Sequence, residues 1–185
     1  MSIAMSPTRQ QFPLSPKKVI KKTLVGTIGF FFLYVFLAGL LAIMTLSANT
    51  GSAGFVSIIL FVFLILLSTS VALNYLYQQW YFNVYFYDLG GDYIVIRKGP
   101  ITPREITIPY ERIQDVYVDQ DIVDRLFGLY DVHLSSATIT SGMEAHIDGV
   151  EKPAADGLRA ALLKTVSERI SKVRGQAVPP YTAQQ

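Results

Sequence analysis

Residues 113–134 read "IQDVYVDQDIVDRLFGLYDVHL", two stretches rich in β-branched residues on either side of a short acidic and apolar segment. Asp121 occupies the N-cap position of a short helix, and Asp124 follows it at capping-box spacing. Gly128 comes where such a turn needs a residue of positive φ to end. This stretch therefore predicts a strand, one capped helical turn and a second strand, and it governs the interpretation of the whole chain.

The apolar residues of that turn predict a packing role. Ile122 and Leu126 share one helical face, and Phe127 stands beside them, so we expect a hydrophobic plug between the two strands. A calcium loop would require a glycine at its sixth position and a glutamate at its twelfth. Counted from Asp119, those positions hold an aspartate and a tyrosine. The sequence thus predicts a structural motif here, and no metal site.

The first half of the chain is hydrophobic throughout. Residues 23–87 contain no Asp, Glu, Lys, Arg or His. Two segments, 23–47 and 55–77, are each long enough as helices to cross a hydrocarbon core of about 30 Å. Aromatic residues typical of a membrane interface follow the second segment: Tyr75, Tyr77, Trp80 and Tyr81. Residues 23–81 therefore predict a transmembrane hairpin.

Basic residues predict the orientation of this hairpin. The arm formed by residues 1–22 contains no acidic residue, and its basic residues are Arg9, Lys17, Lys18, Lys21 and Lys22. The positive-inside rule places both termini in the cytoplasm, which gives a multi-pass protein of the plasma membrane. Everything after Tyr87 carries a net charge of about −3. The arm is thus the expected contact with anionic lipids in the bilayer.

Residues 82–175 predict a mainly β domain with one helix. Six stretches rich in β-branched and aromatic residues are separated by turn signals. The final segment changes to helical spacing, with apolar residues at Leu158, Leu162, Val166, Ile170 and Val173. We expect a strongly bent sheet closed at one end by this helix. Residues 176–185 are expected to be disordered or to serve as a docking tail.

The domain also carries a specific resemblance. The segment "IPYERIQDVYVDQDIVDRLFGLYDVHLSSA", followed by "HIDGVEKPAADGLRAAL" and preceded by two spans, resembles the YdbS-type bacterial pleckstrin-homology (PH) membrane proteins. The resemblance implies a PH-like split barrel capped by the C-terminal helix. It implies no catalytic residues, since that family shares none.

Catalysis is not expected from the residues either. The chain has no cysteine, and its only histidines are His133 and His146. If the "TSG" turn closes a hairpin, these histidines are about four positions out of register and on the order of 13 Å apart, too far to share a metal. The domain lacks the basic stripe that nucleic-acid binding requires. We expect no enzyme activity, no cofactor and no nucleic-acid partner.

Two function classes remain. The first is a non-catalytic interaction module that assembles at the membrane with copies of itself or with other membrane proteins. The second is recognition of an anionic lipid headgroup, for which Arg97, Lys98 and Arg104 around a Gly-Pro turn are the candidates. Because this turn runs directly into Glu105, we favour the interaction module. The partner, the oligomeric state and the pathway are not determined by the sequence.

Overall fold

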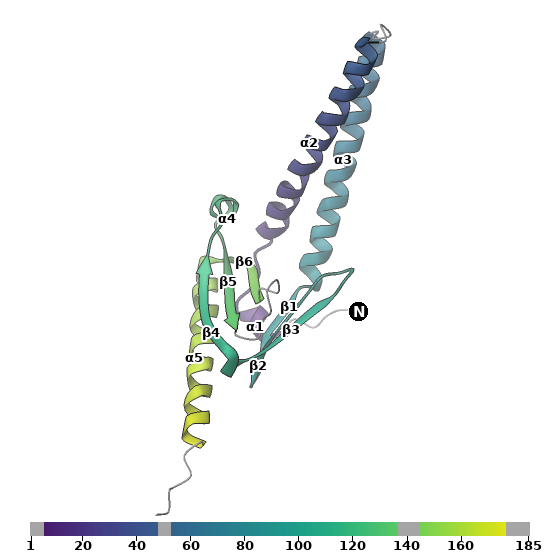
Figure 1. Cartoon of the computed structure of the whole chain (residues 1–185). Coiled ribbons are helices and arrows are strands. Elements are labelled where there is room, and N and C mark those ends of the chain that lie inside the picture. Colours follow the sequence, from purple (N-terminus) through teal and green to yellow (C-terminus); the bar gives the residue numbers. More distant parts are fainter. Residues whose placement is uncertain (1–5, 48–52, 137–144, 177–185) are drawn as a thin grey trace, which may run out of the picture. The chain divides into compact units, whose positions relative to one another are not determined.

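The computed structural model describes residues 6–47, 53–136 and 145–176. It divides into two compact units. The helical unit comprises residues 19–82, and the domain unit comprises the described parts of residues 1–18 and 83–185. The elements of both are drawn in Figure 1.

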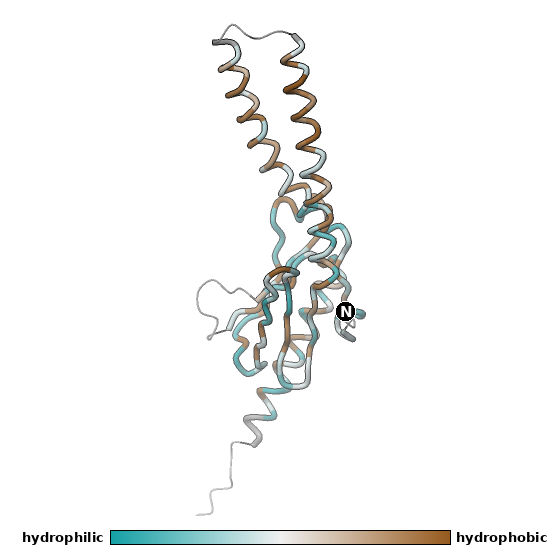
Figure 2. The backbone as a smooth tube through the Cα atoms, turned by 90° about the vertical axis from the view of Figure 1, so that its right-hand side faces the viewer, coloured by the Kyte–Doolittle hydropathy of each residue, from teal (hydrophilic) through white to brown (hydrophobic). Residues whose placement is uncertain are grey.

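The helical unit consists of two long helices, α2 (Lys17–Ser47) and α3 (Ala53–Val84). Both are long and apolar enough to cross a membrane, and the side chains of their most apolar windows are not buried. Figure 2 shows the hydrophobic colouring that dominates both helices. α3 continues beyond the predicted end of its span, because "QQWYFNV" contains neither proline nor glycine to stop it. The first two residues of α2 belong to the domain unit.

The domain unit contains two antiparallel three-stranded sheets. The first holds β1 (Phe86–Leu89), β2 (Tyr93–Lys98) and β3 (Arg104–Pro109), and the second holds β4 (Ile113–Asp119), β5 (Leu129–Ser136) and β6 (Ala145–Glu151). The remaining elements are α1 (Pro7–Gln11), η1 (Tyr110–Arg112), α4 (Ile122–Phe127) and α5 (Lys152–Gln176). All six predicted strands are present. Among the described residues no strand of one sheet pairs with the other, so the expected split barrel is not closed.

The core lies between the sheets and α5. Three tyrosines, Tyr85, Tyr87 and Tyr110, are fully buried, and so are apolar residues of both sheets. α5 adds Leu158 and Leu162 to this core, as its helical spacing predicted. Farther along α5 the apolar side chains are only half-buried, so the helix covers the core with its first half.

The pairing of β5 with β6 differs from the expected register. His133 lies directly opposite His146, so the expected separation of four positions is wrong. Buried pairs set this register, because they keep one face of both strands toward the core: Val132 with Ile147, and Leu134 with Ala145. The "TSG" turn that suggested the other register lies outside the described residues.

The N-terminal segment is part of the domain, contrary to the expected division at residue 22. We define this segment as residues 6–18. α1 packs beside β1, and Leu14 forms a β-bridge with Val150 of β6. The Ser15 N–H donates to the Gly149 carbonyl at 2.9 Å. The domain is therefore discontinuous in sequence, with the two long helices inserted between its first and second pieces.

Candidate functional site

The N-terminal segment is held by a buried ion pair. Lys18 Nζ lies 2.9 Å from Asp148 Oδ1, and the two side chains are only 4% and 8% exposed. The same ammonium lies 4.0 Å from the ring centroid of Tyr85, in the geometry of a cation–π contact. Lys18 was expected to contact lipid. It lies instead in the interior of the domain, since an acidic partner and an aromatic face are available there.

Hydrogen bonds to β1 and the residue before it hold the rest of the segment. The Ser6 hydroxyl donates to the Tyr87 carbonyl, and Thr8 Oγ1 donates to Asp88 Oδ1 at 2.7 Å. Arg9 Nη1 donates to the Tyr85 carbonyl at 2.5 Å. Burial lowers the pKa of Arg9, and burial raises the pKa of the Tyr87 phenol. Arg9 is therefore buried within the domain, and its guanidinium, like the Lys18 ammonium, is not available to contact a membrane surface.

Lys17 makes a second, exposed ion pair. Its Nζ lies 3.1 Å from Glu151 Oε1, with both side chains 51% exposed. The Ser15 hydroxyl donates to the same oxygen at 3.1 Å. Hydrogen bonds from Lys17 and Ser15 hold the pKa of Glu151 below its usual value. Of the predicted lipid-contacting lysines, Lys21 and Lys22 lie outside the domain unit, on α2.

The predicted headgroup residues lie on the paired strands β2 and β3. Arg97 Nε and Nη2 donate to Glu105 Oε2 at 2.8 and 2.6 Å, across the β2–β3 pair. Lys98 is the register partner of Arg104, and its Nζ lies 3.5 Å from His146 Nε2. The local acid therefore neutralises one of the three cations.

The caps predicted around α4 are confirmed. The Asp121 carboxylate accepts from the Asp124 backbone N–H at 2.5 Å, and Gly128 has a φ of 67°. The hydrophobic plug is wrong, because Ile122 is 90% exposed and Leu126 is 78% exposed. Helical spacing correctly put them on one face, but that face points to solvent.

The histidines form a stack that the expected register had excluded. The His133 ring lies between Tyr117 and His146, at centroid distances of 4.9 and 5.3 Å. His133 Nε2 is 3.1 Å from Asp119 Oδ1, and Asp131 lies opposite Asp119 in the sheet. These two aspartates and His133 offer ligand atoms within 4.8 Å of one another, so they could hold a metal ion. Asp119 already pairs with His133, and Asp131 accepts from the Gly149 N–H at 2.8 Å. Both aspartates thus already make contacts within the second sheet.

The two long helices contact each other through a few polar groups. The Tyr34 and Ser70 hydroxyls are 2.7 Å apart. Asn74 Nδ2 donates to the Thr23 carbonyl at 3.1 Å, so this polar side chain joins the two helices. A Cβ at Gly26 would lie 2.5 Å from Asn74 Nδ2, so glycine permits this close approach.

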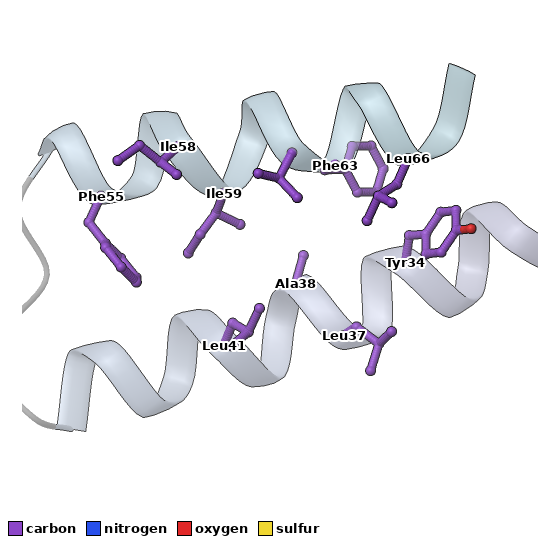
Figure 3. Close-up of a pocket in the computed structure, with 10 residues that line it drawn as sticks. Tyr34, Leu37, Ala38, Leu41, Phe55, Ile58, Ile59, Phe63 and Leu66 are labelled. Atoms are coloured by element: carbon purple, nitrogen blue, oxygen red, sulfur yellow. The ribbon is translucent and has the colours of Figure 1, made fainter. Parts of the chain in front are cut away.

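A groove opens between α2 and α3, with a volume of about 300 Å³. Figure 3 shows Ala38 of α2 and Ile59 of α3 pointing into it. Its lining is apolar except for the Tyr34 hydroxyl: Tyr34, Leu37, Ala38, Leu41, Phe55, Ile58, Ile59, Val62, Phe63 and Leu66. The sequence analysis did not locate this groove.

The sequence matches a known protein family. A family model described as "Bacterial PH domain" matches residues 24–166. The chain belongs to the bacterial PH domain family. The match covers both long helices and most of the domain, up to the first half of α5. Neither the comparison with curated proteins nor that with solved structures found a match. The match identifies the family of the domain and assigns no activity to it.

Proposed function

We propose that this chain is a multi-pass protein of the plasma membrane, of the YdbS-like kind. It presents its bacterial PH domain in the cytoplasm as a non-catalytic interaction module. The module assembles with copies of itself or with other membrane proteins.

The groove between α2 and α3 carries this proposal. In a bilayer its apolar walls face hydrocarbon, where close packing with another helix is a main source of association. Ala38 leaves room for such a helix on the α2 side, and Phe63 and Ile59 offer contact area on the α3 side. The occupant that we infer is a hydrophobic helix of a second copy or of another membrane protein.

Photo-crosslinking tests the groove directly. A photoreactive phenylalanine analogue replaces Phe63, which lines the groove, or Phe61, which is 65% exposed and does not line it. After irradiation in native membranes, Phe63 should give a protein adduct of dimer mass or one that identifies a membrane partner. Phe61 should give little. If neither position yields a protein adduct, lipid fills the groove and the assembly proposal falls.

A non-catalytic role is supported by the placement of the reactive residue types. The sequence has no cysteine, and both histidines lie in the stack on the β4–β5–β6 sheet. Serving as a headgroup receptor is less well supported. The domain unit contains all 14 acidic residues and every basic residue except Lys21 and Lys22, so its formal charge is zero. A neutral domain has no general attraction to an anionic leaflet.

The orientation has its own test, since the chain offers no native cysteine. Ser171 is exposed on α5, whereas Ser52 lies outside the described residues, in the segment between the helices. Ser52→Cys should react with an impermeant maleimide in intact cells. Ser171→Cys should react only after permeabilisation. Labelling of Ser171→Cys in intact cells would reverse the proposed topology.

A further inference from the structure

Three side chains of metal-ligating type meet on the second sheet. Asp119 is the last residue of β4, and Asp131 and His133 stand two positions apart on β5. Each offers one ligand atom, and the three atoms lie within 4.8 Å of one another. Val132, between the two β5 residues in sequence, is fully buried, so Asp131 and His133 share the face of the sheet opposite the core.

Strand pairing brings these side chains together. Asp119 and Asp131 are register partners, and His133 is the partner of Tyr117, two residues before Asp119. Two carboxylates directly opposite each other in a sheet repel, and a divalent cation between them would be attracted to both. The ligands come from two paired strands and include an imidazole, so this group differs from the calcium loop that the sequence excluded.

The ring of His133 is held in a fixed direction. Tyr117 and His146 stack on its two faces, at centroid distances of 4.9 and 5.3 Å. Its Nδ1 is buried, whereas its Nε2 lies 3.1 Å from Asp119 Oδ1. Two ligands of one tetrahedral Zn²⁺ ion are about 3.4 Å apart, because each lies about 2.1 Å from the metal. His133 and Asp119 are therefore already close to the separation of two ligands on one ion.

Asp131 is positioned by the backbone of β6. The Gly149 N–H donates to Asp131 Oδ1 at 2.8 Å. Carboxylates that bind metals are commonly held by such hydrogen bonds, which fix their orientation. The three ligand atoms, all within 4.8 Å, need to close by at most about 1.4 Å around an ion. Rotation of the Asp119 side chain, which is 56% exposed, is sufficient for this adjustment.

We propose that Asp119, Asp131 and His133 bind a divalent transition-metal cation of the Zn²⁺ class. One imidazole nitrogen with two carboxylate oxygens suits such ions better than Mg²⁺ or Ca²⁺, which prefer oxygen ligands alone. α4 leaves the sheet between Asp119 and Asp131, so the bound ion ties β4 to β5 at the base of this helix. Its role is structural. The inference concerns the domain unit alone and does not depend on the proposed membrane function.

Metal titration of the full-length protein in detergent, with any affinity tag removed, tests the site. The protein is treated with a chelator and then titrated with Zn²⁺, and with Co²⁺, whose visible absorption reports coordination. Asp119→Asn removes a charge from an exposed side chain and should fold normally. His133→Phe removes the nitrogen ligand and keeps an aromatic ring in the stack. His146→Phe is the matched control, since His146 belongs to the same stack but not to the ligand cluster.

We expect a single Zn²⁺ per chain and a melting temperature that rises with Zn²⁺ concentration, because the ligands converge only in the folded domain. Asp119→Asn and His133→Phe should each weaken binding by about tenfold or more, whereas His146→Phe should not. If His133→Phe does not fold, Asp119→Asn alone decides.

Three results would overturn the inference. The first is a native protein that does not bind Zn²⁺. The second is unchanged affinity in Asp119→Asn, which would mean adventitious binding only. The third is an equal loss of affinity in His146→Phe, which would assign the ion to the histidine pair. A melting temperature raised as strongly by Mg²⁺ or Ca²⁺ as by Zn²⁺ would contradict the assignment of a transition metal.

Discussion

Two basic regions of the domain unit, the N-terminal segment and the β2–β3 region, place their charges differently. The N-terminal segment withdraws Arg9 and Lys18 into the interior, where Lys18 is 3% exposed. The β2–β3 region leaves Arg97 at the surface, with its side chain 45% exposed beside Glu105. Both regions are clusters of basic residues in the sequence. The basic residues of the N-terminal segment stabilise the interior of the domain, whereas Arg97 in the β2–β3 region lies at its surface.

The difference teaches that the partner of a charge determines its role. Lys18 loses its hydration and gains Asp148 and the Tyr85 ring in exchange, so the loss of either charged partner removes a close opposite charge from the buried one that remains. Arg97 keeps most of its water, and its ion pair is correspondingly weak. The contrast between the two regions can be measured.

The largest expected effect comes from Lys18→Ala. Removal of the ammonium takes the opposite charge at 2.9 Å away from the buried Asp148 carboxylate, which should lower the free energy of unfolding by about 3–5 kcal/mol. Denaturant titration of the full-length protein in detergent, followed by the circular dichroism of the sheets, measures it. The combined change Lys18→Met with Asp148→Leu should be less damaging than Lys18→Ala. An effect of Lys18→Ala no larger than that of Lys17→Ala would contradict the buried-pair argument.

A smaller effect is expected where the segment crosses β6. Gly149 has a φ of +78°, and an added Cβ would lie within 2.6–2.8 Å of three Lys18 side-chain atoms. Gly149→Ala should therefore cost about 1–3 kcal/mol through backbone strain and crowding. The same titration measures it. Gly39→Ala is the control, because a Cβ there meets nothing within 4 Å, and it should leave the domain transition unchanged.

Lys17→Ala should cost less than either change above, since its ion pair with Glu151 is exposed to solvent. The folded-state pKa of Glu151 is lowered, so its contribution is present above its unfolded pKa and is lost as the pH falls through the folded pKa. In Lys17→Ala this acid-dependent loss should shrink. An unchanged pH dependence of unfolding between the native protein and Lys17→Ala would show that the pair does not act on Glu151.

The smallest effect belongs to the β2–β3 region. Replacing Arg97, Lys98 and Arg104 together by alanine should change stability by no more than about 1 kcal/mol. It should also leave the photo-crosslinked complex and the lipids that co-purify with the protein unchanged. Lipid mass spectrometry provides the check. An anionic lipid that is enriched with the native protein and lost with the triple variant would turn this surface cluster into a headgroup site.

Local signals were predictable and distant partners were not. The caps at Asp121 and Gly128 depend on residues within one turn, so the sequence predicts them. The pairing of Lys18 with Asp148 joins residues 130 positions apart, and nothing in the local pattern around Lys18 distinguishes it from Lys17. Periodicity placed Ile122 and Leu126 on one face, but periodicity does not say what lies opposite that face.

The histidine register failed for a related reason. The expected register was taken from a turn signal, whereas the observed one follows from the inward faces of both strands. Val132 and Ile147 are fully buried, and their burial fixes His133 against His146. The groove between α2 and α3 was also beyond prediction, because its volume depends on how two separate helices diverge.

The discontinuous domain has a consequence for the order of events during synthesis. Lys18 leaves the ribosome 130 residues before Asp148, an interval on the order of ten seconds at typical bacterial elongation rates. During that interval both long helices emerge, while Asp148 is not yet present to bind the Lys18 ammonium. It is then a hydrated charge beside the first hydrophobic segment, available as a topogenic signal. The same lysine can thus first help to orient the nascent chain and, once β6 is translated, become an interior residue that completes the fold.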